Sequence, residues 1–406
     1  MRPVTSARTG TNSTIQIYWL ALGTFAIGTE GFMIAPLLPR MAADLRVGVW
    51  VVGQLVTVFA LTYAVSSPIL TALTGSFDRR KLLLLSMTAF ALANIVAWAA
   101  KNYWWVMGAR ILLALAAGLY VPNANALASG LAAPERRGRA LAIVNAGTTV
   151  AVAFGVPLGA VVGDRLGWRE TFAGVGILAA LATIGLSFGL HRRVGSVMSM
   201  ISLRERIAIA QRPDVLLALL VTTLWATGAY TVYTYVALLL SAAAGLKGIG
   251  ISAALFLWGI SAAAGVFTGG HLSDRLGARS VMIPALIALA LAFASLSATA
   301  TLLIPSNALG PVLCAIVVWG VAAWSFFPAQ QARLIGIAGA KVAPIVLSLN
   351  ASFMFIGFSS GAALGSVTVA HGSVANLGWV GAACELAAVL FLSVTSRRTT
   401  AVSLRG

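Results

Sequence analysis

The run "IQIYWLALGTFAIGTEGFMIAPL", residues 15–37, decides the fold class of this chain. Apart from Glu30 it carries no charged side chain. A helix rises about 1.5 Å per residue and the hydrocarbon core of a bilayer is about 30 Å thick, so about 20 apolar residues cross it. The run therefore predicts a membrane-spanning helix with a carboxylate inside it.

Eleven further runs have the same length and character. Of 406 residues, 60% are hydrophobic and only 9% are charged, which excludes a soluble domain of this size. The short alternating segments typical of a membrane β-barrel are missing, so the sequence predicts an all-α membrane protein with 12 transmembrane helices. The predicted spans are 15–37, 49–73, 82–100, 104–130, 140–163, 168–190, 215–241, 249–271, 280–303, 308–332, 342–370 and 375–395.

The basic residues are distributed unevenly between the two sides of the predicted membrane. With the N-terminus placed inside, 20 of the 27 Lys and Arg residues fall on the cytoplasmic side, six fall on the other side, and Arg110 lies within a span. This asymmetry predicts that both termini are cytoplasmic. The net charge of +17 is therefore attributed to the positive-inside distribution of a membrane protein, and nucleic-acid binding is not predicted from it.

The predicted spans form two halves. The polar interval 191–213 is interpreted as a cytoplasmic linker between bundles at 1–190 and 214–406, and its segment "LRERIAIAQR" (203–212) predicts a short amphipathic helix at the inner surface. Several features recur at nearly one sequence offset. These pairs are Asp78 with Asp274, Pro122 with Pro328, Asn145 with Asn350, and Gly159 with Gly365. The repeat predicts two pseudo-symmetric six-helix bundles.

The sequence resembles the major facilitator superfamily over nearly its whole length. The resemblance rests on "PLLPRMAADL" (36–45), "GSFDRRK" (75–81) with its repeat "GGHLSDRLGAR" (269–279), "RILLALAAG" (110–118), "GVPLG" (155–159) and "GDRLGWRETF" (163–172). Within the superfamily it is similar to the 12-span drug:proton antiporter group, in its arabinose-efflux-permease-like branch, through "TGAYTVYTYVALLL" (227–240), "FFPAQQARL" (326–334) and "LSLNASFMFIGF" (347–358). The resemblance implies alternating access in a bacterial inner membrane, with the proton gradient as energy source and no cofactor.

Glu30 and Arg110 are the candidate proton-coupling residues. Glu30 lies about eight residues from the outer end of its span and Arg110 about seven, so both sit about 10–12 Å below the outer surface and are expected to meet. An unpaired carboxylate near the middle of a membrane helix costs about 2.5–3.5 kcal/mol. The resemblance implies a role in proton handling for both residues. The alternatives are a fixed ion pair that only orients two helices, or a Glu30 side chain that snorkels toward the outer surface.

The repeated loop motif is the candidate conformational latch. In the family such a charge cluster holds the outward-facing state, and the resemblance assigns that role to Gly75, Asp78, Arg79, Arg80, Gly270, Asp274 and Arg275. The first copy lacks the second glycine of the family motif, because Arg80 follows Arg79 directly. The alternative is a solvated loop whose arginines only obey the charge asymmetry.

Small residues at helical spacing predict close helix packing. They are Gly155 and Gly159 with Pro157 in the fifth span, and Gly361 and Gly365 in the eleventh. Pro157 is expected to bend its helix. The fifth span resembles an antiporter signature, although Val156 stands where the family has glycine before the proline.

The resemblance implies a substrate cavity formed by the first, fourth, seventh and tenth spans. In the seventh span, Thr227 and Tyr230 share a helix face. The candidate cavity residues are Asn123, Asn145, Thr227, Tyr230, Tyr233, Trp324, Gln330, Gln331 and Asn350. Some of these polar groups are expected to make interhelical hydrogen bonds instead. Aromatic and amide walls favour an uncharged or cationic small molecule.

The sequence contains no enzyme motif in the structural setting that its chemistry requires. No Gly precedes a Lys as in an ATP-binding loop, "GFSSG" (357–361) lies within a predicted helix, and Cys314 and Cys384 lie in apolar spans, so no catalytic residue and no metal site is predicted. Glu385, the other buried acid, is expected to have a packing role. The predicted function is export of a small organic molecule, of the drug or sugar class, by proton antiport. The chain is expected to be monomeric. Uptake by symport or facilitated diffusion remains open, and a non-transporting receptor is disfavoured.

Overall fold

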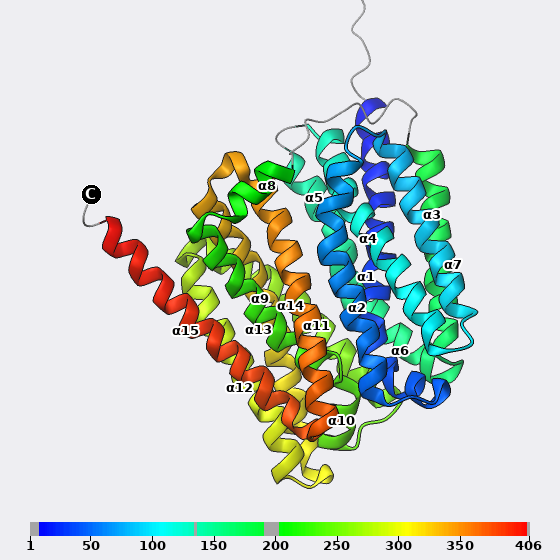
Figure 1. Cartoon of the computed structure of the whole chain (residues 1–406), viewed down its shortest axis with the longest axis vertical. Helices are drawn as coiled ribbons and strands as arrows, with labels where there is room; N and C mark the ends of the chain where they lie inside the picture. The colour runs from blue at the N-terminus through cyan, green and yellow to red at the C-terminus, as the bar shows by residue number, and fades with distance from the viewer. Residues whose placement is uncertain (1–7, 134–135, 191–202, 404–406) are drawn as a thin grey trace, which may run out of the picture. The chain divides into compact units, whose positions relative to one another are not determined.

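The computed structural model describes residues 8–133, 136–190 and 203–403, and no β-strand occurs among them. Within these residues, 12 helices are long and apolar enough to cross a membrane, which confirms the predicted fold class (Figure 1). The spans are Ile15–Leu45, Val49–Leu73, Arg79–Trp98, Tyr103–Leu131, Arg137–Arg165, Trp168–Gly189, Pro213–Tyr233, Ile249–Leu276, Ala278–Leu302, Pro305–Ala338, Ala343–His371 and Val374–Val394.

Two spans differ from a simple helix. The seventh predicted span is two helices, α9 (Pro213–Tyr233) and α10 (Val236–Ala244), because Tyr235 has φ −111° and ψ 24°, outside the helical region. The fifth span is composed of α5 (Arg137–Val150), a π-helical turn η2 (Ala151–Gly155) and α6 (Val156–Arg165). Pro157 is the second residue after this turn, and proline has no N–H to continue the regular hydrogen-bond ladder.

Internal contacts divide the chain into two compact units. One contains Met1–Met33 and Ser66–Met200, and the other contains Ile34–Val65 and Ile201–Gly406. The sequence repeat assigns residues 34–65 to the first bundle, whereas their contacts place them with the second half of the chain. The two assignments of residues 34–65 differ because a sequence repeat reflects the common origin of the two halves, whereas contacts reflect the packing of the folded chain. Residues 191–202 of the predicted linker lie outside the described residues.

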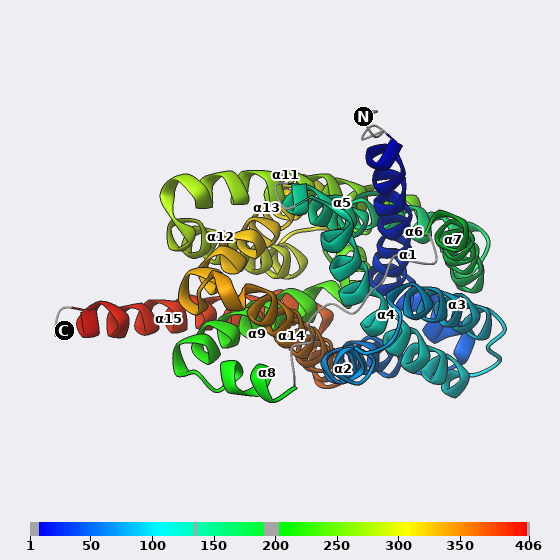
Figure 2. The same ribbon diagram turned by 90° about the horizontal axis from the view of Figure 1, so that it is seen from above.

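In the first unit, α3 (Arg79–Trp98) packs between α4 (Tyr103–Leu131) and α7 (Trp168–Gly189) (Figures 1 and 2). The helix α1 (Arg8–Leu45) is tied to its neighbours by polar contacts. Thr24 Oγ1 donates to the Val144 carbonyl at 2.5 Å, and Tyr120 Oη donates to the Leu20 carbonyl at 3.2 Å. These bonds hold α1 against α5 and α4.

In the second unit, α9 packs against α14 (Ala343–His371) and α15 (Leu377–Ser403) (Figure 2). The helix α12 (Ala278–Leu302) contacts α15 and α13 (Pro305–Ala338), and α13 also packs on α11 (Ile249–Leu276). The short helix α8 (Leu203–Ala210) confirms the helix predicted there. Arg206 of α8 is mostly buried and donates to Ser348 Oγ of α14 at 2.6 Å, so α8 is held against the protein on one side.

Candidate functional site

A buried ion pair joins α1 to α4. Arg110 Nη1 donates to Glu30 Oε1, and both side chains are 0% exposed. The structure therefore brings together the two residues that the sequence placed at equal depth. The second carboxylate oxygen of Glu30, Oε2, accepts no hydrogen bond from the described residues.

The energetics of this pair depend on both partners being present. Removing one member of a buried pair typically costs about 3–5 kcal/mol, because the remaining charge is left without compensation. The pair as a whole contributes much less to stability, since desolvation offsets most of the Coulomb attraction. A buried pair of this kind is therefore weak evidence for a purely stabilising role.

The fifth span packs closely against α1 beside Glu30. A Cβ at Gly159 would lie 3.1 Å from Met33 Cβ, and a Cβ at Gly155 would overlap the side chain of Thr29. Glu30 lies between these two contact residues of α1. The glycines predicted for helix packing thus let η2 and α6 approach the helix segment that carries the acid.

The glycines of α14 make an equivalent close approach to α9. Thr231 Oγ1 donates to the Gly361 carbonyl at 3.2 Å, and a Cβ at Gly365 would lie 2.9 Å from the Thr231 carbonyl oxygen. Thr227 donates back to the Thr223 carbonyl within α9 at 2.8 Å. This packing fixes how α9 is rotated against α14, and with it the direction of the helix face that carries the predicted cavity residues.

Buried aromatic rings pack against one another in the second unit. Tyr230 stacks on Phe358 with ring centroids 3.7 Å apart, and Tyr233 packs against Trp258 at 5.0 Å. Trp258 in turn packs on Trp319 at 5.5 Å. Trp258 and Trp319 were missed in the sequence, because a tryptophan in an apolar span gives no signal of the direction in which its ring points.

The amides of the second unit form a buried network across three helices. Gln330 of α13 donates to Thr222 Oγ1 at 2.8 Å and to the Ala218 carbonyl at 2.6 Å. Thr222 donates to Asn350 Oδ1 of α14 at 2.7 Å. Gln330 and Asn350 are thus engaged in helix-to-helix hydrogen bonds, the alternative that the sequence left open for such groups.

The remaining predicted cavity residues are scattered. Gln331 and Trp324 are half-buried on α13, Asn145 of α5 is exposed, and Asn123 of α4 is buried and accepts from Arg79. Their contact with a substrate stays a prediction.

The first loop motif is held by contacts within its own unit. Asp78 caps α3 by accepting from the Lys81 backbone N–H at 2.9 Å. Arg80 donates to the Leu190 and Ser187 carbonyls at 2.8 and 2.7 Å, which stabilises the C-terminal end of α7. The buried Gly75 precedes this cluster.

In the second copy of the motif, Gly270 is half-buried, and Asp274 and Arg275 are exposed in the last turn of α11. The latch role of both copies stays a prediction.

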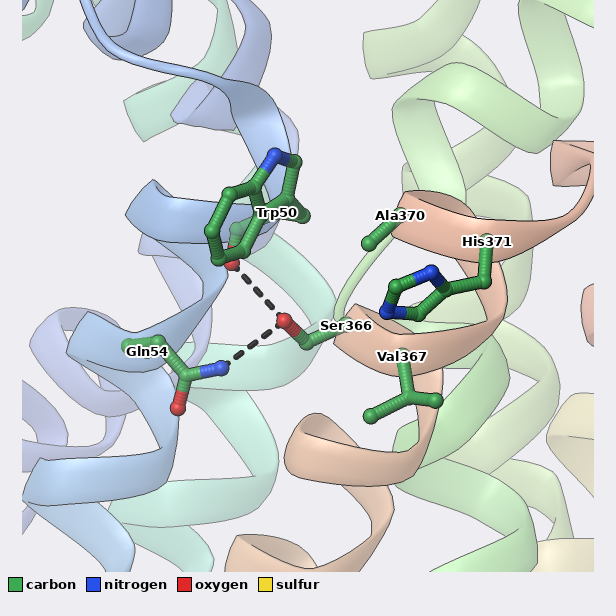
Figure 3. A pocket seen from close by; sticks show the side chains of 6 residues that line it. All are labelled: Trp50, Gln54, Ser366, Val367, Ala370 and His371. Atoms are coloured by element: carbon green, nitrogen blue, oxygen red, sulfur yellow. Dashed lines mark hydrogen bonds between the residues drawn. The ribbon is translucent and has the colours of Figure 1, made fainter.

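A pocket of 260 Å³ lies between the first turns of α2 (Val49–Leu73) and the last turns of α14 (Figure 3). Ser366 joins the two helices, because its hydroxyl accepts from Gln54 Nε2 at 2.8 Å and donates to the Trp50 carbonyl at 2.9 Å. His371 and Val367 complete the α14 side of the pocket.

The same two helices also meet deeper along their length. Tyr63 stacks on Phe355 with centroids 3.8 Å apart, and Ser359 donates to the Thr57 carbonyl at 3.0 Å.

Among the described residues, no group of three His, Cys, Asp or Glu side chains is arranged to hold a metal ion.

Comparison with known proteins agrees with this architecture. Two solved structures share the fold along nearly the whole chain. A variant of the nucleoside transporter NupG aligns with a TM-score of 0.74 at 12% identity, covering 93% of this chain and 99% of that one. A bacterial homologue of the human lysosomal transporter Spinster, in an inward-facing and unoccupied conformation, aligns with a TM-score of 0.69 at 16% identity, covering 97% and 96%.

Sequence relatives are more similar. The uncharacterized MFS-type transporter YbcL of Bacillus subtilis is 32% identical over 379 residues, covering 93% of this chain and 95% of that protein. A chloramphenicol resistance protein of Streptomyces lividans is 35% identical, with coverage of 66% and 69%. The inner membrane transport protein YdhP of Escherichia coli K12 is 29% identical, with coverage of 87% and 88%. Residues 20–362 match the family model of the Major Facilitator Superfamily. The chain is therefore a membrane transporter rather than an enzyme, and it belongs to the major facilitator superfamily.

Proposed function

We propose that this transporter exports a small organic molecule by proton antiport. The observation that carries the proposal is the fully buried ion pair of Glu30 with Arg110, in which one carboxylate oxygen is left without a hydrogen bond among the described residues. Such intramembrane ionisable pairs mark proton or ion pathways in transporters. The relative named as a chloramphenicol resistance protein supports export.

The proton acts through a change in the strength of this pair. Protonation of Glu30 removes its negative charge and weakens its attraction to Arg110, and separation of the two groups favours protonation in turn. A conformational change that alters their distance or their access to water therefore changes proton affinity, which is the requirement for coupling.

The positive charge asymmetry supports an inner-membrane orientation with both termini in the cytoplasm.

The direct test is transport by the purified full chain in lipid vesicles. A thermal-stability screen against sugars, nucleosides, antibiotics and organic cations first identifies a ligand, since a ligand that binds only the folded state raises the Tm. Counterflow of that ligand is then measured with and without an imposed pH gradient. Export is expected to accelerate when protons move in the opposite direction. Acceleration by protons moving in the same direction as the ligand would instead establish symport, and a rate independent of the gradient would establish facilitated diffusion.

The contacts between α2 and α14 support a further part of the proposal, that this pair of helices closes the outer side of the transport path. Ser366 with Gln54, and Tyr63 with Phe355, are the contacts that must open in each cycle. A variant with Gln54→Cys and Ser366→Cys is expected to lose transport when a short bifunctional thiol reagent links the two positions. Reduction of a cleavable linker restores transport.

The background for this experiment replaces Cys314 and Cys384 by serine, because both are free thiols. Each single cysteine variant, treated with the same reagent, is the matched control and keeps its transport rate. Full transport by the cross-linked double variant would show that α2 and α14 do not separate at this point.

A further inference from the structure

Glu385 is a second fully buried carboxyl group, and it lies in the other unit of the chain. Its side chain on α15 is 0% exposed. The carboxyl occupies a notch against α9 at Gly228, where a Cβ would lie 2.6 Å from Glu385 Oε1 and 2.8 Å from the Gly381 carbonyl oxygen. The missing side chain at position 228 therefore provides the room for the carboxyl.

Neither oxygen of this carboxyl has a hydrogen-bond partner within the described part of the chain. The contrast with Glu30 is direct, because Glu30 is paired with Arg110 at the same degree of burial. Salt-bridge partners for Glu385 are also missing from the described residues.

Among the described residues, the helices that pack on α15 carry their charged side chains away from the notch. Asp214 and Arg279 are in the first turns of α9 and α12, and His371 is in the last turn of α14, all at helix ends, whereas Gly228 lies well inside α9. The turn η4 (Val374–Asn376) carries no titratable side chain.

Three other titratable groups lie on α9 or beside Glu385 on α15. The ring of Tyr230 is stacked on Phe358 of α14, and the ring of Tyr233 packs at a tilt against Trp258 of α11. The Cys384 thiol precedes Glu385 directly along α15, and a thiol has no positive charge with which to stabilise a carboxylate. Among the titratable groups that the structure describes on these helices, none near the notch therefore supplies a positive charge.

An isolated ionised carboxylate in such surroundings is so unfavourable that the group takes up a proton instead. We propose that Glu385 is a proton-binding site distinct from the Glu30–Arg110 pair, and that its carboxyl carries a proton in this conformation. The proposal does not depend on the direction of transport. Release of this proton requires α9 and α15 to separate at Gly228, which is the neighbour of Thr227 on the helix predicted to line the substrate cavity.

Infrared spectroscopy of the purified full chain tests the proposal. At pH 9 solvent-exposed Asp and Glu side chains are ionised. The wild-type protein is then expected to keep the C=O stretching band of a protonated carboxylic acid, and Glu385→Gln is expected to lose it. Glu30→Gln is the matched control, since it also removes one buried acid but should leave this band in place. A difference spectrum between wild type and Glu385→Gln that contains only carboxylate bands would overturn the proposal.

A second measurement needs no variant. Hydrophobic carbodiimides react with protonated carboxyl groups in apolar surroundings, and mass spectrometry of peptides locates the adduct. At pH 9 the peptide that contains Glu385 is expected to be labelled in the wild-type protein in vesicles. Failure to label this peptide, under conditions in which the same peptide is labelled after unfolding at acidic pH, would contradict a protonated Glu385.

Discussion

Glu30→Gln is expected to abolish the proton release that substrate drives in reconstituted vesicles. Glutamine keeps the shape of the side chain and a hydrogen-bond acceptor for Arg110, but it cannot gain or lose a proton. The pair then contains no carboxyl group from which substrate binding could release a proton. The measurement is the pH change in a weakly buffered vesicle suspension after addition of the ligand found by the stability screen. Unchanged proton release would remove Glu30 from the mechanism.

The same variant carries a stability cost that has to be separated from the loss of coupling. It removes the negative charge of Glu30 that compensates the buried Arg110 guanidinium, and removal of one charge of a buried pair typically costs about 3–5 kcal/mol. The double variant Glu30→Gln with Arg110→Gln removes both charges and is expected to recover most of the Tm without recovering proton release. Recovery of proton release by the double variant would show that the pair has only the structural role of orienting α1 and α4.

Gly361→Ala is expected to have the largest effect on folding among conservative changes in α14. A Cβ there would lie 2.9 Å from the Thr231 backbone nitrogen and 3.0 Å from Tyr230 Cβ, with the Thr227 carbonyl oxygen closer still. Backbone atoms of α9 cannot rotate away as a flexible side chain does, so the two helices must separate. Overpacking of this kind typically costs about 1–3 kcal/mol. Thermal unfolding of the purified protein measures the expected fall in Tm.

The matched control is Gly336→Ala on α13, a helical glycine with no neighbouring atom within 4 Å of the added Cβ. It should unfold at the same temperature as the wild type or higher, because alanine is a better helix former than glycine by about 1 kcal/mol. Equal Tm values for the two variants would show that α9 and α14 are not in close contact at Gly361.

Part of the candidate site could be predicted because depth in a membrane follows from position along a helix. Glu30 and Arg110 lie on antiparallel spans at similar distances from the same surface, and a buried charge strongly favours an opposite charge at its own level. Their contact therefore needed only the hydropathy pattern and the helical rise. The partners of Gln330 and Asn350 were not predictable in this way. A neutral amide is satisfied by any nearby carbonyl or hydroxyl, and the sequence does not say which helix supplies it.

The amino-acid sequence alone determined the 12 membrane helices, because the transfer of side chains and backbone from water to hydrocarbon is a local property of each segment. The tertiary structure decided which faces of those helices meet. Only the structure places residues 34–65 against the second half of the chain and interrupts the seventh span at Tyr235. Only the structure also leaves Glu385 in a notch where no described residue donates a hydrogen bond to it. The physical reason is that lipid chains are as apolar as leucine, so hydropathy does not distinguish a face toward protein from a face toward lipid. That choice rests on close packing and hydrogen bonds, which depend on the rotation of each helix about its axis and on the identity of its neighbour.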